Sequence, residues 1–398
     1  MKIVFLSYVF WPPDFGGELL ISIERAEELS KRGHEVTFLT SGRQGFPAFD
    51  VVKGVKIYRS PMIHESRAGR ILRRGFFVLW GFQRLLAMDF QILHIGSLPG
   101  IGKISCSIIG KLIASVAHSK KARCVTVISI AEKEETPIDL QGMAGKIYRS
   151  FLLCMDNIVG VSITLYEAIQ RSFPGKAVLI PCGVRDDIFL PLSAVRRAQV
   201  RAESGDSEND IIFIFLGSVG ARKGFDLLAQ AFAELSPVHP EWRLWVIGPH
   251  NKEQNQNIVL EEVNSVTQPL KGNDRVTFWG RIDNRQRLAE VLAAGDVFVF
   301  PSRREGMGIA PMEAMAAGLP VIIARIPGVT DMVNIHGETG YYITPGNLDE
   351  LKKAMNKLGT DKILRERMGR KARARVIESF GWEKHIDQWE SLYRSLKE

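Results

Sequence analysis

Two glutamates in the C-terminal half of the chain have the type and spacing that point most directly to chemistry. Glu305 follows the apolar run Val297 to Phe300, and Glu313 follows a short glycine-rich stretch. We expect that run to be a strand, with a helix beginning near Ile309. The helix start would aim free N–H groups and a positive dipole end at the loop, which suits a diphosphate. Because carboxylates accept hydrogen bonds from hydroxyls, the pattern suits a ligand that carries both phosphates and sugar hydroxyls.

Two neighbouring cations follow a second expected strand. The run Ile211 to Leu216 leads into Gly217-Ser218 and then into Arg222 and Lys223. Ligands of doubly wound sheets bind outside the carboxyl ends of the strands, so we expect this turn to lie at a ligand-binding edge of its sheet.

Short apolar runs alternate with longer amphipathic segments, a pattern typical of βαβ units with parallel sheets. One series starts at Ile3 to Leu6, and a second starts at Ile211 after the polar stretch Arg185 to Asp210. The sequence predicts an α/β protein of two doubly wound, Rossmann-like domains, 1–186 and 187–380, facing each other across a cleft. A final helix, 381–398, is expected to pack back on the first domain. Other strands are expected at Val36 to Leu39, Ile92 to Ile95, Val125 to Ile130, Asn157 to Val161, Ala177 to Ile180, Leu244 to Ile247, Val276 to Phe278, Val297 to Phe300 and Val321 to Ile323.

Composition narrows the class of protein. The 398 residues are 45% hydrophobic and 24% charged, with a net charge of +8, which suits anionic partners such as nucleotides or lipid phosphates. The start, Met1 to Ser7, is too short and too soon polar for a signal peptide, and no run is long enough to span a membrane. With no CxxC pair, we expect a cytoplasmic protein whose cysteines are core residues rather than zinc ligands or disulfides. These are Cys106, Cys124, Cys154 and Cys182.

The stretch Ser302 to Gly318, with its Glu-x7-Glu spacing, closely resembles the signature of family 4 retaining glycosyltransferases, which have the GT-B architecture. The resemblance extends over almost the whole chain. It implies that Glu305 binds donor-sugar hydroxyls, that Glu313 binds the ribose, and that nearby backbone amides bind the diphosphate. It implies transfer from a nucleotide-sugar on one face of the sugar, without a protein nucleophile. We expect a glycan or lipid-linked acceptor, and a small soluble acceptor stays open. The residues expected to act in catalysis are Glu305, Lys223 and Arg222, and those expected to bind the donor are Gly16, Gly17, Ser218, Arg281, Gly306, Met307, Gly308, Ile309, Ala310 and Glu313.

Two departures from the family pattern bear on activity. The stretch Leu216 to Leu228 resembles the family's phosphate-binding turn. Ser218 stands where the family usually has an arginine in that turn, Lys223 matches its lysine, and we expect Arg222 to supply the missing guanidinium from an adjacent position. The resemblance implies that both cations reach the same diphosphate and stabilise the negative charge that builds on the departing nucleotide. Ile128-Ser129 stands where many members carry a histidine that contacts the donor sugar, with the charged run Glu132 to Glu135 following. These departures leave open a catalytically weak nucleotide-sugar-binding subunit as an alternative function. A nucleotide-sugar epimerase is a second alternative. With no DxD-like motif in a donor loop, we expect neither a metal nor a cofactor.

The segment Arg67 to Met88 interleaves arginines with aromatic and aliphatic residues. Such a helix suits a membrane interface rich in anionic lipid, and the alternative is an ordinary amphipathic helix with solvated arginines. We therefore expect a cytoplasmic enzyme of polysaccharide or glycolipid synthesis, with a possible site of action at the inner face of the membrane. UDP and GDP donors stay open, and no nucleic-acid partner is expected.

Overall fold

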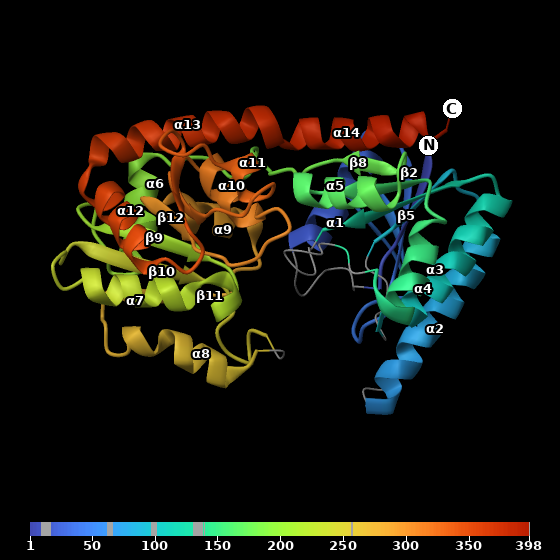
Figure 1. Ribbon diagram of the computed structural model, residues 1–398, viewed down its shortest axis with the longest axis horizontal. Helices are drawn as coiled ribbons and strands as arrows, with labels where there is room; N and C mark the ends of the chain where they lie inside the picture. Colours follow the sequence, from blue (N-terminus) through green and yellow to red (C-terminus); the bar gives the residue numbers. More distant parts are fainter. Residues whose placement is uncertain are drawn as a thin grey trace. The chain divides into compact units, whose positions relative to one another are not determined.

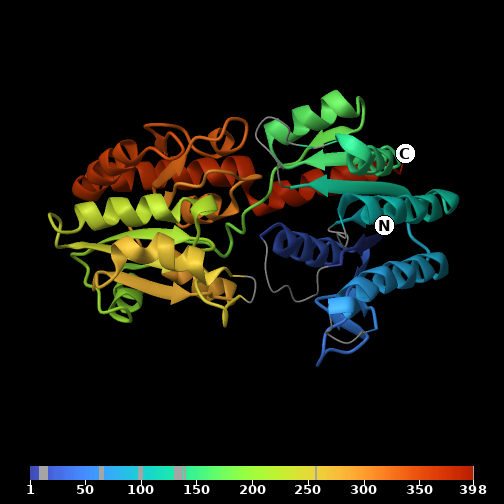
Figure 2. The same ribbon diagram turned by 60° about the horizontal axis from the view of Figure 1, so that its bottom comes forward.

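The computed structural model describes residues 1–8, 17–61, 67–96, 102–129, 138, 140–255 and 258–397. The chain divides into two compact units, each with helices beside its own sheet (Figures 1 and 2). Unit 1 comprises Met1–Cys182 and His385–Glu398, and unit 2 comprises Gly183–Lys384. The predicted α/β class with two parallel sheets is confirmed. The assignment of an acceptor side to one unit and a donor side to the other stays a prediction.

The sheet of unit 1 has the order β3-β4-β2-β1-β5-β6-β7-β8 and is parallel except for the antiparallel β3–β4 pair. Its central strands are continuous apolar runs, as expected for strands covered on both faces; Ile3 to Leu6 are at most 3% exposed. The strands are β1 (Lys2–Leu6), β2 (Glu35–Thr40), β3 (Phe49–Val52), β4 (Val55–Arg59), β5 (Ile92–Ile95), β6 (Arg123–Ile128), β7 (Asn157–Gly160) and β8 (Ala177–Leu179).

Three helices of unit 1, α2, α3 and α4, lie side by side (Figure 1). The helices of this unit are α1 (Gly17–Lys31), α2 (Arg67–Ala87), α3 (Gly102–Ser119), α4 (Gly142–Leu152) and α5 (Ile163–Ser172). Among the described residues, no helix of either unit is both long and apolar enough to cross a membrane.

The last helix, α14 (Trp382–Ser395), packs on unit 1 through its aromatic face. Trp389 and Tyr393 are fully or almost fully buried. The Tyr393 hydroxyl lies 2.7 Å from Nδ1 of His94 on β5, and the Arg25 guanidinium of α1 lies 3.9 Å from the centre of the Trp389 ring. His385 on α14 adds a 2.8 Å hydrogen bond from Nδ1 to the carbonyl oxygen of Pro181. These contacts hold the C-terminal helix against the first sheet.

The sheet of unit 2 is parallel throughout, in the order β11-β10-β9-β12-β13-β14. The order reverses between β9 and β12, and ligands of doubly wound sheets bind outside the carboxyl ends of strands at such a point. The strands are β9 (Ile211–Leu216), β10 (Trp242–Ile247), β11 (Val276–Gly280), β12 (Val297–Phe300), β13 (Val321–Ala324) and β14 (Gly340–Ile343).

Helices cover the sheet of unit 2, and α7, α8 and α12 share one apolar cluster with it, which includes Phe213, Trp242 and Met355. Side-chain caps begin several of these helices: Asn284, Asn347 and Asp361 each accept a backbone N–H of the first turn. The helices are α6 (Ala194–Ala202), α7 (Phe225–Leu235), α8 (Leu260–Thr267), α9 (Arg285–Ala293), α10 (Ile309–Ala316), α11 (Thr330–Val333), α12 (Leu348–Thr360) and α13 (Lys362–Phe380), with short 3-10 turns at Ala221–Lys223 and Gln268–Leu270.

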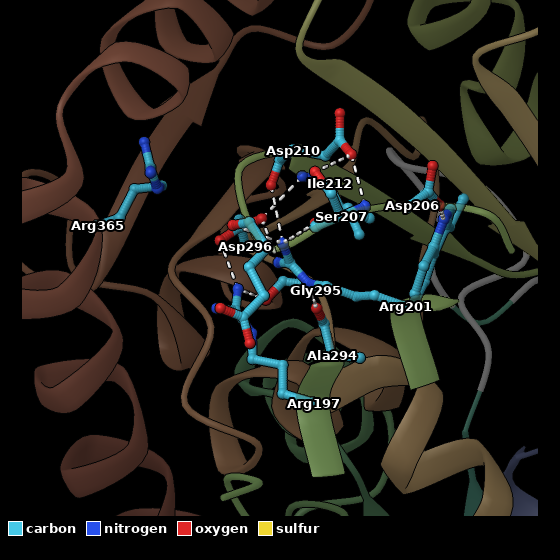
Figure 3. A network of polar contacts seen from close by, with 12 residues as sticks. Arg197, Arg201, Asp206, Ser207, Asp210, Ile212, Ala294, Gly295, Asp296 and Arg365 are labelled. Atoms are coloured by element: carbon cyan, nitrogen blue, oxygen red, sulfur yellow. Dashed lines mark hydrogen bonds and ion pairs between the residues drawn. The ribbon is translucent and has the colours of Figure 1, made fainter. Parts of the chain in front are cut away.

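The polar stretch expected to be a linker folds onto unit 2 through a buried arginine. Arg201 of α6 is 1% exposed and donates to Asp296 (2.7 Å) and to the carbonyl oxygens of Ala294 and Asp210 (2.9 and 2.8 Å; Figure 3). Asp296 also accepts from Arg197 (2.6 Å) and from the backbone N–H of Ile212 in β9 (2.8 Å). Burial lowers the pKa of Arg201, and the Asp296 carboxylate opposes that effect. The network fastens α6 to the start of two central strands.

Candidate functional site

Two loops that follow adjacent strands come together in unit 2. β9 and β12 pair in parallel, so their carboxyl ends lie at the same edge of the sheet. The segment after β9 contains Ser218, Arg222 and Lys223, and the segment after β12 contains Ser302 and Glu305. The structure therefore brings the predicted basic turn and the predicted Glu305 loop together at the reversal point of the sheet.

An ion pair between Lys223 and Glu305 joins the two loops of this site. The Lys223 ammonium lies 2.6 Å from Oε1 of Glu305, and their side chains are 17% and 10% exposed. The Ser302 hydroxyl donates to the same oxygen at 2.6 Å. The Lys223 ammonium also lies 5.1 Å from the centre of the Phe300 ring. Glu305 is thus held by two donors, one charged and one neutral, before any ligand binds.

A second set of contacts fixes the basic turn against the Glu305 loop. Arg303 forms a paired ion bridge with Asp226 at 2.7 and 2.8 Å and also donates to the carbonyl oxygen of Ala221. The Asp226 carboxylate raises the pKa of the Arg303 guanidinium. Arg222 donates to the carbonyl oxygen of Arg304 at 3.2 Å, and its guanidinium is 3.9 Å from Glu305. With two cations to one carboxylate, this part of the site keeps positive charge for an anion.

One glycine of this turn is required by close packing. Gly224 has φ +71°, and an added Cβ would lie 2.0 Å from the carbonyl oxygen of Pro301. Only glycine tolerates both the left-handed backbone and that approach. Gly224 therefore allows the turn after β9 to lie directly on the segment after β12.

The helix predicted to begin near Ile309 begins there, as α10 (Figure 1). Gly308 precedes it with φ +78°, and Gly306, Met307 and Gly308 are buried. The first N–H groups of a helix have no partner within the helix, and here Ile309 and Ala310 are partly exposed. The start of α10 can therefore present backbone donors to an anion.

Glu313 lies one turn inside α10 and is 4% exposed. Its Oε1 accepts a 2.5 Å hydrogen bond from Arg285, the first residue of α9, whose guanidinium lies 4.8 Å from the centre of the Phe189 ring. The second glutamate of the motif is therefore already paired with a cation. A ligand hydroxyl would have to share that carboxylate with Arg285.

The other predicted donor-binding residues lie at the edges of this arrangement or outside it. Ser218 is partly exposed in the turn after β9. Arg281 follows β11 and forms a 2.6 Å ion pair with Asp283. Gly17 is the first residue of α1 in unit 1. Gly16 and the charged run Glu132 to Glu135 lie outside the described residues. Ile128 ends β6 and is 8% exposed.

Sequence reasoning missed three residues that build the site: Ser302, Arg285 and Arg303. Ser302 lies within the glycine-rich motif but, being a common turn residue, carries no signal of its own. Arg285 directly follows the helix-capping Asn284, and that position marks a helix start without indicating a partner on α10. The charged pair Arg303 and Asp226 is far apart in sequence, so only the strand order brings the two together.

Comparisons with known proteins agree with this arrangement. A family model described as Glycosyltransferase Family 4 matches residues 22–188, and one described as Glycosyl transferases group 1 matches residues 196–375. N-acetyl-alpha-D-glucosaminyl L-malate synthase of Bacillus anthracis is 26% identical, over 96% of this chain and 94% of its own. Mannosylfructose-phosphate synthase of Agrobacterium fabrum is 28% identical, over 93% of this chain and 84% of its own.

Solved structures share the fold over the full length. Sucrose-phosphate synthase of Thermosynechococcus elongatus has a TM-score of 0.82 at 22% identity, covering 100% of this chain and 99% of its own. HepE of Anabaena, solved in complex with UDP and glucose, has a TM-score of 0.76 at 18% identity, covering 99% of this chain and 100% of its own. At such identities the likeness shows the fold, and that fold is GT-B. Since the two family models together match most of the chain, this protein belongs to the family 4 glycosyltransferases.

Proposed function

We propose that this protein is a retaining, metal-independent glycosyltransferase that moves a hexose-type sugar from a UDP- or GDP-sugar to a hydroxyl acceptor. The observation that carries the proposal is the contact of Lys223 with Glu305 beside the start of α10, at the reversal point of the unit 2 sheet. One site then offers cations and backbone N–H groups for a diphosphate, and a carboxylate for the attached sugar. The bound UDP and glucose of HepE also support a nucleotide-sugar donor.

The chemistry follows from how these groups meet the ligand. Lys223 and Arg222 stabilise the negative charge that the leaving nucleoside diphosphate gains as the C1–O bond breaks. The first amides of α10 bind the same phosphates. Glu305 accepts hydrogen bonds from sugar hydroxyls and fixes C1 relative to the incoming hydroxyl. The leaving phosphate oxygen accepts the acceptor's proton, so transfer occurs on one face of the sugar.

Metal and cofactor independence is part of the proposal. The positive charge of Lys223 and Arg222, with the dipole of α10, does the electrostatic work that a divalent cation would do on a diphosphate. Arg222 lies within reach of Glu305, which supports the idea that it supplies the guanidinium that the family carries at the position of Ser218.

An acceptor near or in a membrane is the second part of the proposal, in polysaccharide or glycolipid synthesis. Helix α2 buries Phe77 and Trp80 but exposes Leu79 and Leu86 (57% and 49%). Exposed leucines on a helix whose sequence also carries arginines suit an anionic bilayer surface. Native protein that fails to sediment with anionic vesicles would contradict this part, and loss of sedimentation on replacing Arg70, Arg73 and Arg74 would support it.

One observation favours a second candidate, a catalytically weak donor-binding subunit. Ile128 offers an apolar, nearly buried side chain where many family members have a histidine on the donor sugar. Such a subunit would bind nucleotide tightly and transfer nothing. An epimerase, the other alternative, would act on the donor without any acceptor.

The deciding experiment incubates the purified protein with UDP-, GDP-, ADP- and TDP-sugars in EDTA, with and without a membrane-lipid extract, and measures released nucleotide. Release that requires the extract and is lost in Glu305→Ala, but not in the matched control Glu366→Ala at an exposed position of α13, supports transfer. Nucleotide binding without release from any donor would favour the subunit. Sugar conversion without the extract would favour the epimerase.

A further inference from the structure

A hollow of about 580 Å³ lies in unit 1, at the amino-terminal edge of its sheet. Gln91 precedes β5, Arg123 begins β6 and Asp156 precedes β7, so the hollow is at the edge opposite the carboxyl ends of the strands. Since β6 has six residues, the two edges are about 17 Å apart. The volume falls within the range of about 300–1,000 Å³ typical of small-molecule sites. The lining includes His118, Lys121, Arg123, Asp156, Leu396 and Lys397.

The lining is cationic. Lys121, Arg123 and Lys397 face one carboxylate, that of Asp156. Asp156 already accepts from Arg123 (3.0 Å), from the backbone N–H of Cys124 (2.7 Å) and from His118 (3.2 Å). Burial alone would raise the pKa of Asp156, but the combined effect of these hydrogen bonds is larger, so the pKa is lowered overall. Among the described residues of the lining, the one carboxylate is thus engaged by Arg123, by His118 and by a backbone N–H.

Two ammonium groups remain available for a ligand. Within the described ranges, neither Lys121 Nζ nor Lys397 Nζ has a hydrogen-bond or ion-pair partner. Lys121 sits in the turn after α3 with φ +59°, a left-handed conformation in which glycine is usual. The backbone N–H groups of the turn are engaged, that of Lys121 with His118 and that of Ala122 with Ala117, both at 2.9 Å. The lysine side chain is therefore not needed to form the turn.

From this charge distribution we infer that the hollow is a second, non-catalytic site for a phosphate-bearing small molecule, bound by Lys121, Lys397 and Arg123. Arg123 also donates to the carbonyl oxygen of Leu396 at 3.2 Å. A dianion bridging Lys121 and Lys397 would therefore fasten the segment that follows α14 to the start of β6. Occupancy would stabilise the docking of α14 on unit 1.

A metal ion fits the same place less well. His118, Cys124 and Asp156 offer ligand atoms within 4.8 Å of one another. Burial, however, raises the pKa of the Cys124 thiol, and only a thiolate binds a metal well. A divalent cation would also have to displace Arg123 from Asp156, beside two further positive charges. The charges of this hollow favour an anion.

The test measures binding of inorganic phosphate and pyrophosphate to the full-length protein by calorimetry and thermal shift, at constant ionic strength set with NaCl. Because the proposed donor site would also bind phosphates, each variant is made in a Lys223→Ala background. Lys121→Gly removes the ammonium while keeping the left-handed turn, which glycine adopts without steric cost. We expect its unliganded melting temperature to be unchanged or higher, and its Kd for pyrophosphate to rise about tenfold, as expected for one charge-assisted contact.

Lys397→Ala should weaken binding similarly, whereas Lys146→Ala, an exposed lysine on α4, should leave the Kd unchanged. Equal affinity in all variants, or no binding left after Lys223→Ala, would overturn the inference without touching the proposed transferase. Zinc binding that Cys124→Ser abolishes, with no pyrophosphate binding, would overturn it in favour of a metal site. Vesicles with phosphatidic acid identify the source: Lys121-dependent vesicle binding indicates a lipid headgroup, and its absence beside pyrophosphate binding indicates a soluble phosphate compound.

Discussion

The ammonium of Lys223 lies 2.6 Å from the carboxylate of Glu305, although the two residues are 82 positions apart in the chain. Each follows a central strand of unit 2, and the two strands are neighbours. The pair places a positive and a negative charge side by side in a partly buried site. In the proposed reaction the lysine turns to the leaving phosphate and the glutamate to the sugar, so both charges find partners when the donor binds.

Removing either charge of this pair should abolish most of the transfer. For Glu305→Gln and Lys223→Ala we expect kcat to fall about 100- to 1,000-fold, the usual cost of losing one preorganised electrostatic contact. Lys223→Ala should also weaken binding of the free nucleoside diphosphate, whereas Glu305→Gln should not, because only the lysine is assigned to the phosphates. Steady-state kinetics and nucleotide titration measure both effects. The matched control is Lys353→Ala at an exposed position of α12. Equal nucleotide affinity in all three variants would contradict the division of roles.

Ser302 should act as a positioning residue. It is 1% exposed and donates to Glu305 at 2.6 Å, so Ser302→Ala removes one of the two donors that orient the carboxylate. Hydrogen bonds to charged groups contribute about 1.5–3 kcal/mol, so kcat should fall about 10- to 100-fold. KM for the donor should change less than kcat, and Ser302→Thr, which keeps the hydroxyl, should recover most of the activity. A loss of stability with unchanged kcat would show that Ser302 serves only the fold.

The strands next to the site could be predicted because their sequence pattern indicates a buried strand and fits no other element as well. Ile211 to Leu216 and Val297 to Phe300 are short, continuous apolar runs, and the structure has both strands with these bounds. Neighbouring parallel strands then place Lys223 and Glu305 at one edge without further information. Contacts that depend on where a side chain reaches across elements, such as Arg285 to Glu313, could not be derived in this way.

The hairpin β3–β4 was missed although it has a local signal. Lys53 and Gly54 join the strands, both with positive φ (+49° and +82°), the geometry of a type I′ turn. Lysine rarely occupies such a position, so the pair does not read as a turn signal in the way that Asn-Gly does. The flanking runs Phe49–Val52 and Val55–Arg59 are also too short and too polar to stand out. The short strand Gly340–Ile343 was missed as well.

The pair Arg285 and Glu313 should be strongly coupled in stability. Glu313 is 6% and Arg285 20% exposed in their side chains. Arg285→Met would leave a buried carboxylate without its cation, which we expect to lower the free energy of unfolding by about 2–4 kcal/mol. Removing both charges, as Arg285→Met with Glu313→Leu, should cost less than the sum of the single changes. A double-mutant cycle by chemical denaturation measures the coupling, and additive effects would contradict it.

Arg201 should be among the most sensitive positions of unit 2. Arg201→Met leaves the carbonyl oxygens of Ala294 and Asp210 without a donor and removes one partner of Asp296. We expect a loss of about 3–5 kcal/mol in the free energy of unfolding. Arg197→Met is the matched control, since Arg197 is 35% exposed and contacts the same carboxylate; it should cost about 1 kcal/mol or less. Similar losses in both variants would show that burial at Arg201 is not what matters.

The docking of α14 should weaken in mild acid because of His385. Burial, with a further contribution from the nearby Arg25 charge, lowers the pKa of His385 to about 3. In the unfolded chain the pKa of His385 is near 6.5. Between about pH 6.5 and pH 3, His385 is therefore protonated in the unfolded state but neutral in the folded state. The stability that neutral His385 contributes is therefore complete above about pH 6.5 and is lost as the pH falls, by about 2 kcal/mol from pH 7 to pH 5.

The variant His385→Asn separates this titration from packing. Its amide can still donate to the carbonyl oxygen of Pro181 but cannot take up a proton, so the variant should be less stable at pH 7 yet lose less stability on acidification. His94 and His34, whose pKa values burial also lowers, leave a residual slope. Glu390, held at a pKa of about 2 chiefly by its hydrogen bond from Arg394, destabilises the fold only as the pH drops below about 4.5. Unfolding measured between pH 7 and pH 5, with hydrogen exchange on α14, therefore isolates the histidines, and equal slopes in variant and native protein would contradict the role of His385.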